Sequence, residues 1–260
     1  DSPAGPFETV YNQPLLSFDE YQRASGGGGC IDPDVFTDDD GSVYFYCGNS
    51  GLIARKMNPD MVSFDPNSAW VKPEGSYRSY FSEGMTVFKH DGRYYFTWSQ
   101  GDTWSRGYNC RWGVSDSPLG SITYMGQMIQ ERPEIGVLAP GHHSVVCREG
   151  TDEWYMIYHR WSTIRSDVVR EVCIDRIYFD EDGNMLEVIP TLTGVAPISD
   201  PEEPGHTHTL THVEAQAATC SKPGNVEYWH CDCGMNFADE NGEEELADVT
   251  TPIDPANHVH

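Results

Sequence analysis

Three short segments place polar side chains at the start of apolar runs. Asp32 precedes a proline, Glu83 precedes a glycine, and His142 and His143 stand side by side. Two carboxyl groups and an imidazole in one pocket can perform acid–base chemistry. One carboxyl protonates a leaving oxygen, while the other acts as a base or tunes the pKa of the first. The hydrolysis of a glycosidic bond requires such a pair.

Each segment also has a simpler interpretation. Asp32 can cap a turn, because Asp-Pro is common in turns. Glu83 can be a solvated loop residue, although Gly84 after it permits close backbone approach. Adjacent residues on a strand point to opposite faces, so at most one of the two histidines faces a central site. The other then lies at the surface or in the core.

The surrounding sequence predicts short antiparallel strands. Runs rich in Val, Tyr, Phe, Thr and Trp follow turns that contain Asp or Gly, a hairpin signal. These runs are Val43–Tyr46, Tyr94–Trp98 and Trp154–Tyr158. They recur at about 50–60 residues, and residues 1–5 match residues 116–120. Such a repeat favours β-propeller blades over the alternative, a β-sandwich whose hairpins share turn chemistry. The three polar segments then open the strands that line the propeller axis.

Charge and composition limit the classes of partner that the chain can bind. The chain has 260 residues, with 16 Lys and Arg against 41 Asp and Glu and a net charge of −25. This charge repels phosphate backbones and anionic lipid surfaces, so we expect neither nucleic acid nor membrane as a partner. No stretch approaches the roughly 18 apolar residues of a membrane-spanning helix. The charge suits a neutral ligand, and the eight cysteines leave the compartment open.

Composition changes near residue 200. Residues 1–200 hold 15 basic and 29 acidic residues, whereas residues 201–260 hold one basic and twelve acidic residues and six of the ten histidines. The intervening stretch is rich in Pro, Gly and acid, as linkers are. We therefore predict a first domain over 1–198, a linker over 199–205 and a small module over 206–260.

Several motifs appear in the order and spacing of a known family, and the chain resembles glycoside hydrolase family 43 over residues 1 to about 196. The motifs are Ile31–Phe36 with Asp38–Gly41, Ser82–Gly84 with Lys89–Phe96, Gly141–Ser144, Tyr158–Arg160 and Arg170–Val172. The resemblance implies an all-β fold, a five-bladed β-propeller. Residues 1–8 match the outer end of the second blade. We therefore expect an incomplete propeller, from roughly the end of blade two through blade five.

The resemblance also implies roles for individual residues. Glu83 is the general acid, and Asp32 is the carboxylate that modulates its pKa and orients it. His142 is an axial substrate-site histidine that can help to coordinate a calcium ion; because a hard cation prefers oxygen ligands, we expect water to mediate that contact. Arg170 is a substrate-contacting residue. Trp98, Trp104 and Tyr108 are candidates for a sugar-stacking wall, with packing in the blade core as the alternative for Trp98.

One family feature has no counterpart in the sequence. The general base of the family is an Asp in the first blade, upstream of the modulating Asp, and residues 1–29 contain no match to it. We therefore expect the chain to begin inside blade two. An inverting hydrolase needs this base to activate water, so we expect little or no turnover from these 260 residues alone.

The C-terminal segment resembles small repeat modules of bacterial surface proteins. Cys220, Cys231 and Cys233 with a nearby His could bind zinc. However, Cys-x-Cys is tighter than the usual zinc-ligand spacing, so we expect a structural or cell-wall-associated module rather than a zinc site.

Together these features predict a secreted or cell-surface bacterial glycosidase. Its expected substrates are plant polysaccharides or oligosaccharides, from which it would release α-L-arabinofuranosyl or related pentosyl units of hemicellulose or pectin side chains. One alternative is a β-xylosidase of the same family. A carbohydrate-binding surface protein without catalytic activity is the other.

Overall fold

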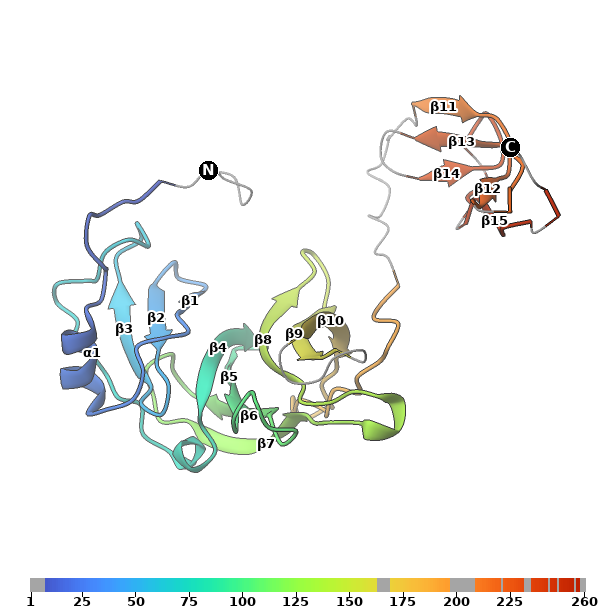
Figure 1. Ribbon diagram of the computed structural model, residues 1–260. Helices are drawn as coiled ribbons and strands as arrows, with labels where there is room; N and C mark the ends of the chain where they lie inside the picture. The colour runs from blue at the N-terminus through green and yellow to red at the C-terminus, as the bar shows by residue number, and fades with distance from the viewer. Residues whose placement is uncertain are drawn as a thin grey trace. The chain divides into compact units, whose positions relative to one another are not determined.

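The computed structural model describes residues 8–162, 169–196, 209–220, 222–231, 235–242, 244–246, 248–254 and 256–257 (Figure 1). The chain divides into two compact units, Asp1–Ala196 and Pro197–His260. The expected linker over 199–205 and the repeat match over 1–5 lie outside the described residues. None of the described helices is both long and apolar enough to cross a membrane.

The first unit contains three antiparallel sheets with the strand orders β1-β2-β3, β4-β5-β6-β7 and β10-β9-β8. Their bounds are β1 Asp34–Thr37, β2 Val43–Cys47, β3 Ile53–Met57, β4 Glu83–His90, β5 Arg93–Gln100, β6 Asn109–Ser115, β7 Thr123–Ile129, β8 Gly141–Cys147, β9 Trp154–Trp161 and β10 Arg170–Ile177. Two short 3-10 helices connect them, η1 Ser76–Ser79 and η2 Pro133–Ile135.

The predicted hairpins form the first two strands of each sheet. Between β4 and β5, His90 pairs with Arg93, and Asp91 and Gly92 between them have φ angles of 47° and 75°. Two successive residues of positive φ form the turn whose twist matches that of the flanking strands. An Asp-Gly pair adopts this conformation readily, which is why the sequence signal was dependable.

The first strands of the three sheets lie on the inside of the unit. β1 contacts β4, and β4 contacts β8. Figure 1 shows the three sheets following one another around these inner strands. This is the arrangement of propeller blades, in which neighbouring sheets pack face to face around an axis. The unit is therefore an all-β, partial propeller, as the sequence predicted.

Apolar side chains fill the spaces between neighbouring sheets. One buried cluster joins Phe36 and Tyr46 of the first sheet to Met85 and Phe96 of the second. A second cluster joins the second and third sheets, with aromatic residues such as Tyr95 and Trp154 on its two sides. Because these clusters pack neighbouring sheets against each other, they fix the positions of the inner strands β1, β4 and β8 relative to one another.

A short helix was not predicted from the sequence. α1 (Phe18–Ser25) covers the outer side of the first sheet, where its Tyr21 is fully buried in a cluster with residues of β2 and β3. Ser17 caps it by accepting a hydrogen bond from the Glu20 backbone N–H, and Gly26 ends it in the left-handed conformation. Both capping signals are visible in the sequence.

The second unit is small and also built of strands. One sheet has the order β11-β13-β14 and the other pairs β12 with β15. The strands are β11 Leu210–Val213, β12 Gly224–Asn225, β13 Tyr228–Cys231, β14 Asn236–Phe237 and β15 Thr250–Thr251.

Candidate active site

The three polar segments meet at the inner strands of the first unit. Asp32 lies just before β1, Glu83 is the first residue of β4, and His142 is the second residue of β8. One oxygen or nitrogen atom from each side chain lies within 4.8 Å of the others. The structure thus brings together residues that are 51 to 110 positions apart in the sequence.

Irregular backbone aims these side chains toward one another. The β4–β5 register shifts between Glu83 and Thr86, and the β8–β9 register shifts between Gly141 and Ser144. Asp32 and His142 have positive φ angles, 56° and 43°. Bulges re-aim side chains, and non-glycine residues in this region of φ are uncommon and cluster at functional sites.

Two hydrogen bonds hold the Glu83 carboxyl group. The Asn49 amide donates to Oε2 at 2.9 Å, and the Tyr108 hydroxyl donates to Oε1 at 2.8 Å. Asn49 is itself fixed by backbone hydrogen bonds to Gly29. Asn49 was not predicted from the sequence, although a polar residue directly after Gly48 at the end of β2 is a recognisable signal.

The Asp32 carboxyl group is less satisfied. Its Oδ2 atom is buried and has no hydrogen-bond partner in the described part of the chain. Its Oδ1 atom lies 4.0 Å from Nε2 of His142, an ion pair when that ring is protonated. Burial raises the pKa of Asp32, and the charge of Glu83 raises it further, whereas His142 lowers it.

The side chain of His143 points away from that of His142 and into the core. Its Nδ1 lies 3.1 Å from the Cys110 sulfur and its Nε2 lies 2.8 Å from Thr97 Oγ1. Because the Thr97 hydroxyl donates to the Thr86 carbonyl, Nε2 must carry the proton and Nδ1 must accept from the thiol. Burial lowers the pKa of His143 to about 3, so the ring stays neutral. One histidine faces the site and the other supports its strand.

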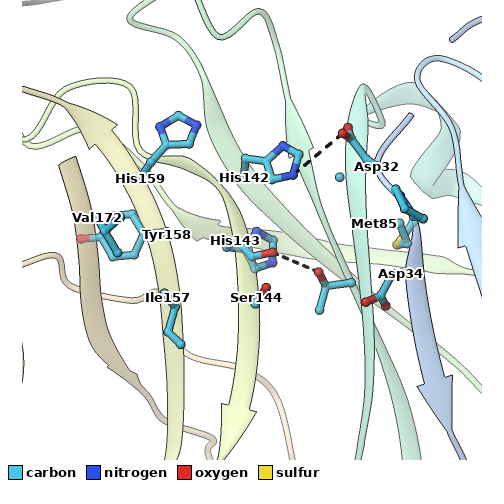
Figure 2. A pocket seen from close by; sticks show the side chains of 13 residues that line it. Asp32, Asp34, Met85, His142, His143, Ser144, Ile157, Tyr158, His159 and Val172 are labelled. Atoms are coloured by element: carbon cyan, nitrogen blue, oxygen red, sulfur yellow. Dashed lines mark hydrogen bonds and ion pairs between the residues drawn. The ribbon is translucent and has the colours of Figure 1, made fainter. Parts of the chain in front are cut away.

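Asp32 and His142 border a cavity of about 300 Å³, and Glu83 lies next to these two residues but is not part of the cavity lining. Figure 2 shows Asp32 and His142 facing each other in it, with His159 on the neighbouring strand. Its lining residues come from all three sheets: Asp32, Pro33, Asp34, Gly84, Met85, Thr86, His142, His143, Ser144, Ile157, Tyr158, His159 and Val172. Burial raises the pKa of Asp34 to about 6.

The other predicted site residues have different surroundings. Arg170, the first residue of β10, is exposed and does not line the cavity, although its charge acts on His159. Trp104 is 61% exposed in the loop between β5 and β6, where its stacking role stays a prediction. Trp98 is fully buried, and its indole donates to the Tyr80 carbonyl. The predicted stacking role of Trp98 is therefore wrong, because its ring fills the core between blades.

The predicted metal sites can be compared with these donors. Asp32, Glu83 and His142 are close enough to share an ion. Each Glu83 oxygen accepts one hydrogen bond and keeps a second lone pair. The water-mediated calcium contact expected for His142 stays a prediction. In the second unit Cys220 is exposed and Cys231 is buried, but Cys233 lies outside the described residues.

The part of the chain that forms these sheets matches a known family. The sequence profile of the glycosyl hydrolases family 43 matches residues 1–185. The chain belongs to glycosyl hydrolase family 43. Its match covers the sheets that carry Asp32, Glu83 and His142, and it ends before the second unit begins.

Individual family members show the same relationship. The β-D-galactofuranosidase xynD of Aspergillus niger is 33% identical over 197 residues, covering 74% of this chain and 54% of that protein. An arabinoxylan arabinofuranohydrolase of Paenibacillus polymyxa is 27% identical, covering 83% and 36%. The structure of an α-L-arabinofuranosidase from Clostridium thermocellum superposes with a TM-score of 0.58 at 28% identity, covering 74% and 64%. The chain thus spans about half or less of the length of these two curated relatives.

Proposed function

We propose that this chain carries the acid side of an inverting glycosidase that releases α-L-arabinofuranosyl or related pentosyl units from plant polysaccharides. Glu83 is the general acid, and Asp32 is the carboxylate that modulates it. The observation that carries the proposal is the convergence of Asp32, Glu83 and His142 within 4.8 Å beside a cavity.

The contacts of Glu83 support its role. The donors Asn49 and Tyr108 fix the carboxyl group in one orientation, so its proton can be aimed at one glycosidic oxygen. A positioned acid contributes typically about 10²–10⁴-fold to a rate. His142 is 42% exposed in its side chain and can therefore contact a ligand.

The relatives favour a five-membered sugar ring. Two of the proteins named above are an arabinofuranosidase and a galactofuranosidase, and a third is an arabinofuranohydrolase. All three names specify furanosides. A β-xylosidase is the alternative, because a further relative is the β-xylosidase of Xylanibacter ruminicola, 27% identical over 200 residues.

The water-activating base is the missing part of this proposal. In inverting enzymes it lies about 6.5–9.5 Å from the acid, so that a water molecule fits between them. Asp32 has an oxygen within 4.8 Å of Glu83, which is too close, and Asp34 is tied to the Val87 backbone N–H at 2.9 Å. Besides Asp32 and Asp34 the described cavity lining holds no carboxylate that could act as this base, and we propose low turnover for this chain alone. Binding without catalysis is the corresponding alternative.

Two substrates with different leaving groups test the role of Glu83 as the general acid. We expect Glu83→Gln to reduce hydrolysis of an unactivated arabino-oligosaccharide by about 10²-fold or more. It should reduce hydrolysis of 4-nitrophenyl α-L-arabinofuranoside far less, because nitrophenolate leaves without protonation. Glu149→Gln, in the exposed turn between β8 and β9, is the matched control. Equal losses on both substrates would exclude Glu83 as the acid.

The stereochemistry and the sugar are tested with the same protein. NMR of the first-formed sugar should show the inverted anomer, whereas retention would make Asp32 a candidate nucleophile instead of a modulator. The rates of hydrolysis of 4-nitrophenyl α-L-arabinofuranoside, β-D-galactofuranoside and β-D-xylopyranoside show which sugar and which ring size the chain prefers. If the chain binds arabino-oligosaccharides but cleaves none of these substrates, the binding alternative holds.

We also propose that the chain acts outside a bacterial cell, because polysaccharides do not cross membranes. Attachment of the second unit to the cell wall stays a prediction. Fractionation of the producing cells would test both statements.

A further inference from the structure

His159 lines the cavity and has no role in the chemistry described above. It lies on β9, paired with Gly141 of β8 and Val172 of β10. Its ring stacks on the Tyr108 ring, with centroids 5.7 Å apart and an interplanar angle of 13°. Since Tyr108 donates to Glu83, His159 is one ring away from the proposed acid.

Both ring nitrogens of His159 are buried, and neither has a hydrogen-bond partner among the residues that the structure describes. Burial lowers the pKa of His159 to about 4, and the nearby charges of Arg170 and His142 lower it further. At neutral pH the ring therefore carries one N–H donor and one bare nitrogen acceptor, both unsatisfied. Most buried polar atoms in proteins are paired, so an imidazole with two unpaired nitrogens calls for an explanation.

Asp32, on the other side of the cavity, also has a buried polar atom that lacks a partner within the described ranges. Asp32 Oδ2 is also buried without a partner, and Figure 2 shows Asp32 and His159 on different sides of the pocket, with His142 between them. A carboxylate oxygen can only accept, whereas a neutral imidazole can donate and accept. An uncharged ligand with more than one hydroxyl group can satisfy both, because a hydroxyl both donates and accepts.

We propose that His159 binds a hydroxyl group of the sugar that fills this cavity. The inference rests on the proposed function only in assuming that a sugar occupies the cavity. Rotation about the Cβ–Cγ bond of histidine is a soft torsion, so the ring can turn a nitrogen edge toward a ligand packed against it. His159 is then a substrate-binding residue on the side of the cavity opposite Asp32.

A purely structural role of His159 would have a different effect on stability and sugar binding. A flat ring that only packs on Tyr108 would be better served by Phe, which has no unpaired nitrogens to bury. We therefore expect His159→Phe to keep or raise the unfolding temperature while it weakens sugar binding. His159→Gln, which retains a donor and an acceptor, should recover most of the binding.

Calorimetry with methyl α-L-arabinofuranoside and L-arabinose tests this directly on the 260-residue chain. We expect His159→Phe to bind at least about 10-fold more weakly than the unsubstituted chain, which corresponds to about 1.4 kcal/mol. His212→Phe, on β11 of the second unit, is the control and should bind normally. Unchanged binding by His159→Phe would overturn the proposal while leaving the glycosidase function intact.

A spectroscopic measurement covers the case in which His159→Phe does not fold. In the unsubstituted chain labelled with ¹⁵N-histidine, the two nitrogen resonances that disappear in His159→Gln belong to His159. Saturating sugar should shift them, and resonances that do not move would overturn the proposal. If the unsubstituted chain binds no sugar, both the proposed function and this inference fail; binding without hydrolysis removes only the catalytic proposal.

Discussion

Asp34 shows how single residues in this site combine structural and electrostatic roles. Its Oδ2 accepts a hydrogen bond from the Val87 backbone N–H and so links the inner strands β1 and β4. An amide oxygen could make the same bond without a charge. The carboxylate therefore carries a cost in this buried position, and burial is the cause of its raised pKa.

The first prediction follows from this cost. Because the pKa of Asp34 rises to about 6 in the folded chain, its ionisation destabilises the fold fully above pH 6. This destabilisation is relieved as the pH falls from about 6 to about 4, the pKa of an unfolded Asp. We expect Asp34→Asn to raise the free energy of unfolding by about 2 kcal/mol at pH 7.5. Chemical denaturation at several pH values measures it.

The gain should disappear below about pH 4, where both forms of Asp34 are protonated. Asp116→Asn, at an exposed position after β6, is the control and should change stability by less than about 0.5 kcal/mol at any pH. A gain that is independent of pH would show that the charge of Asp34 is not its source.

At the scale of strands, a buried chain of hydrogen bonds connects four strands behind the site. The Cys110 thiol of β6 donates to His143 of β8, and His143 donates to the Thr97 hydroxyl of β5. The Thr97 hydroxyl donates in turn to the Thr86 backbone carbonyl of β4. The ends of β4 and β8 carry Glu83 and His142. We therefore expect the relative position of these two residues to depend on an intact chain.

Replacing Cys110 tests this dependence. Cys110→Ser keeps a donor to Nδ1 of His143, whereas Cys110→Ala has about the volume of the Ser variant but leaves that nitrogen unpaired. We expect Cys110→Ala to lower the free energy of unfolding by about 1–3 kcal/mol more than Cys110→Ser does. The ¹⁵N spectrum of His143 should report an altered tautomer in the Ala variant. Equal stability of the two variants would show that the hydrogen bond contributes little.

The β8–β6 junction also depends on a glycine. A Cβ atom placed on Gly141 would lie 2.1 Å from Cε1 of Tyr108, so the ring could not stay where it holds Glu83. We expect Gly141→Ala to lower the free energy of unfolding by about 1–3 kcal/mol and to reduce activity or sugar binding. Thermal denaturation and calorimetry measure the two effects.

A double-mutant cycle shows whether Tyr108 is the cause. In a Tyr108→Ala background the added methyl group has room, so Gly141→Ala should then cost much less. Gly126→Ala is the control, because a Cβ there would meet its nearest atom, Trp112 Nε1, at an ordinary 3.5 Å. Equal costs in both backgrounds would contradict the steric explanation.

The same elements show what the sequence could and could not predict. The turns with Asp91 and Gly92 were predictable because their φ angles follow from local residue type. The convergence of Asp32, Glu83 and His142 followed from the repeat, since the first strand of each blade lines the axis. The partners of Glu83, by contrast, depend on how separate loops pack: Asn49 and Tyr108 are 34 and 25 residues away from it. No local pattern specifies such contacts.

Trp98 is a residue for which the sequence allowed two roles and the predicted one was wrong. Aromatic residues after a catalytic acid can form a sugar platform or fill a core, and their spacing does not distinguish the two. Position along β5 decides between them: Trp98 is buried between blades, whereas Trp104 in the following loop is exposed.

At the scale of the whole molecule, the site and the charge are distributed unequally between the two units. All residues assigned to the site lie in Asp1–Ala196. Residues 201–260 hold twelve acidic residues and one basic residue, a large part of the net charge of −25. Self-repulsion of like charges destabilises compact states and is screened by salt. The second unit should therefore influence salt dependence but leave ligand binding unaffected.

Ending the chain after Ala196 tests this separation. We expect the shortened chain to bind methyl α-L-arabinofuranoside with a Kd within about twofold of that of the 260-residue chain, because the cavity lining lies entirely in the first unit. The full chain should show an additional unfolding transition that moves to higher temperature between 20 and about 300 mM salt, as repulsion is screened over a Debye length that shrinks with ionic strength. Scanning calorimetry at both salt concentrations follows this transition. Weaker binding by the shortened chain would mean that the second unit contributes to the sugar site, and a salt-independent transition would mean that its acidic residues are too well dispersed to repel one another.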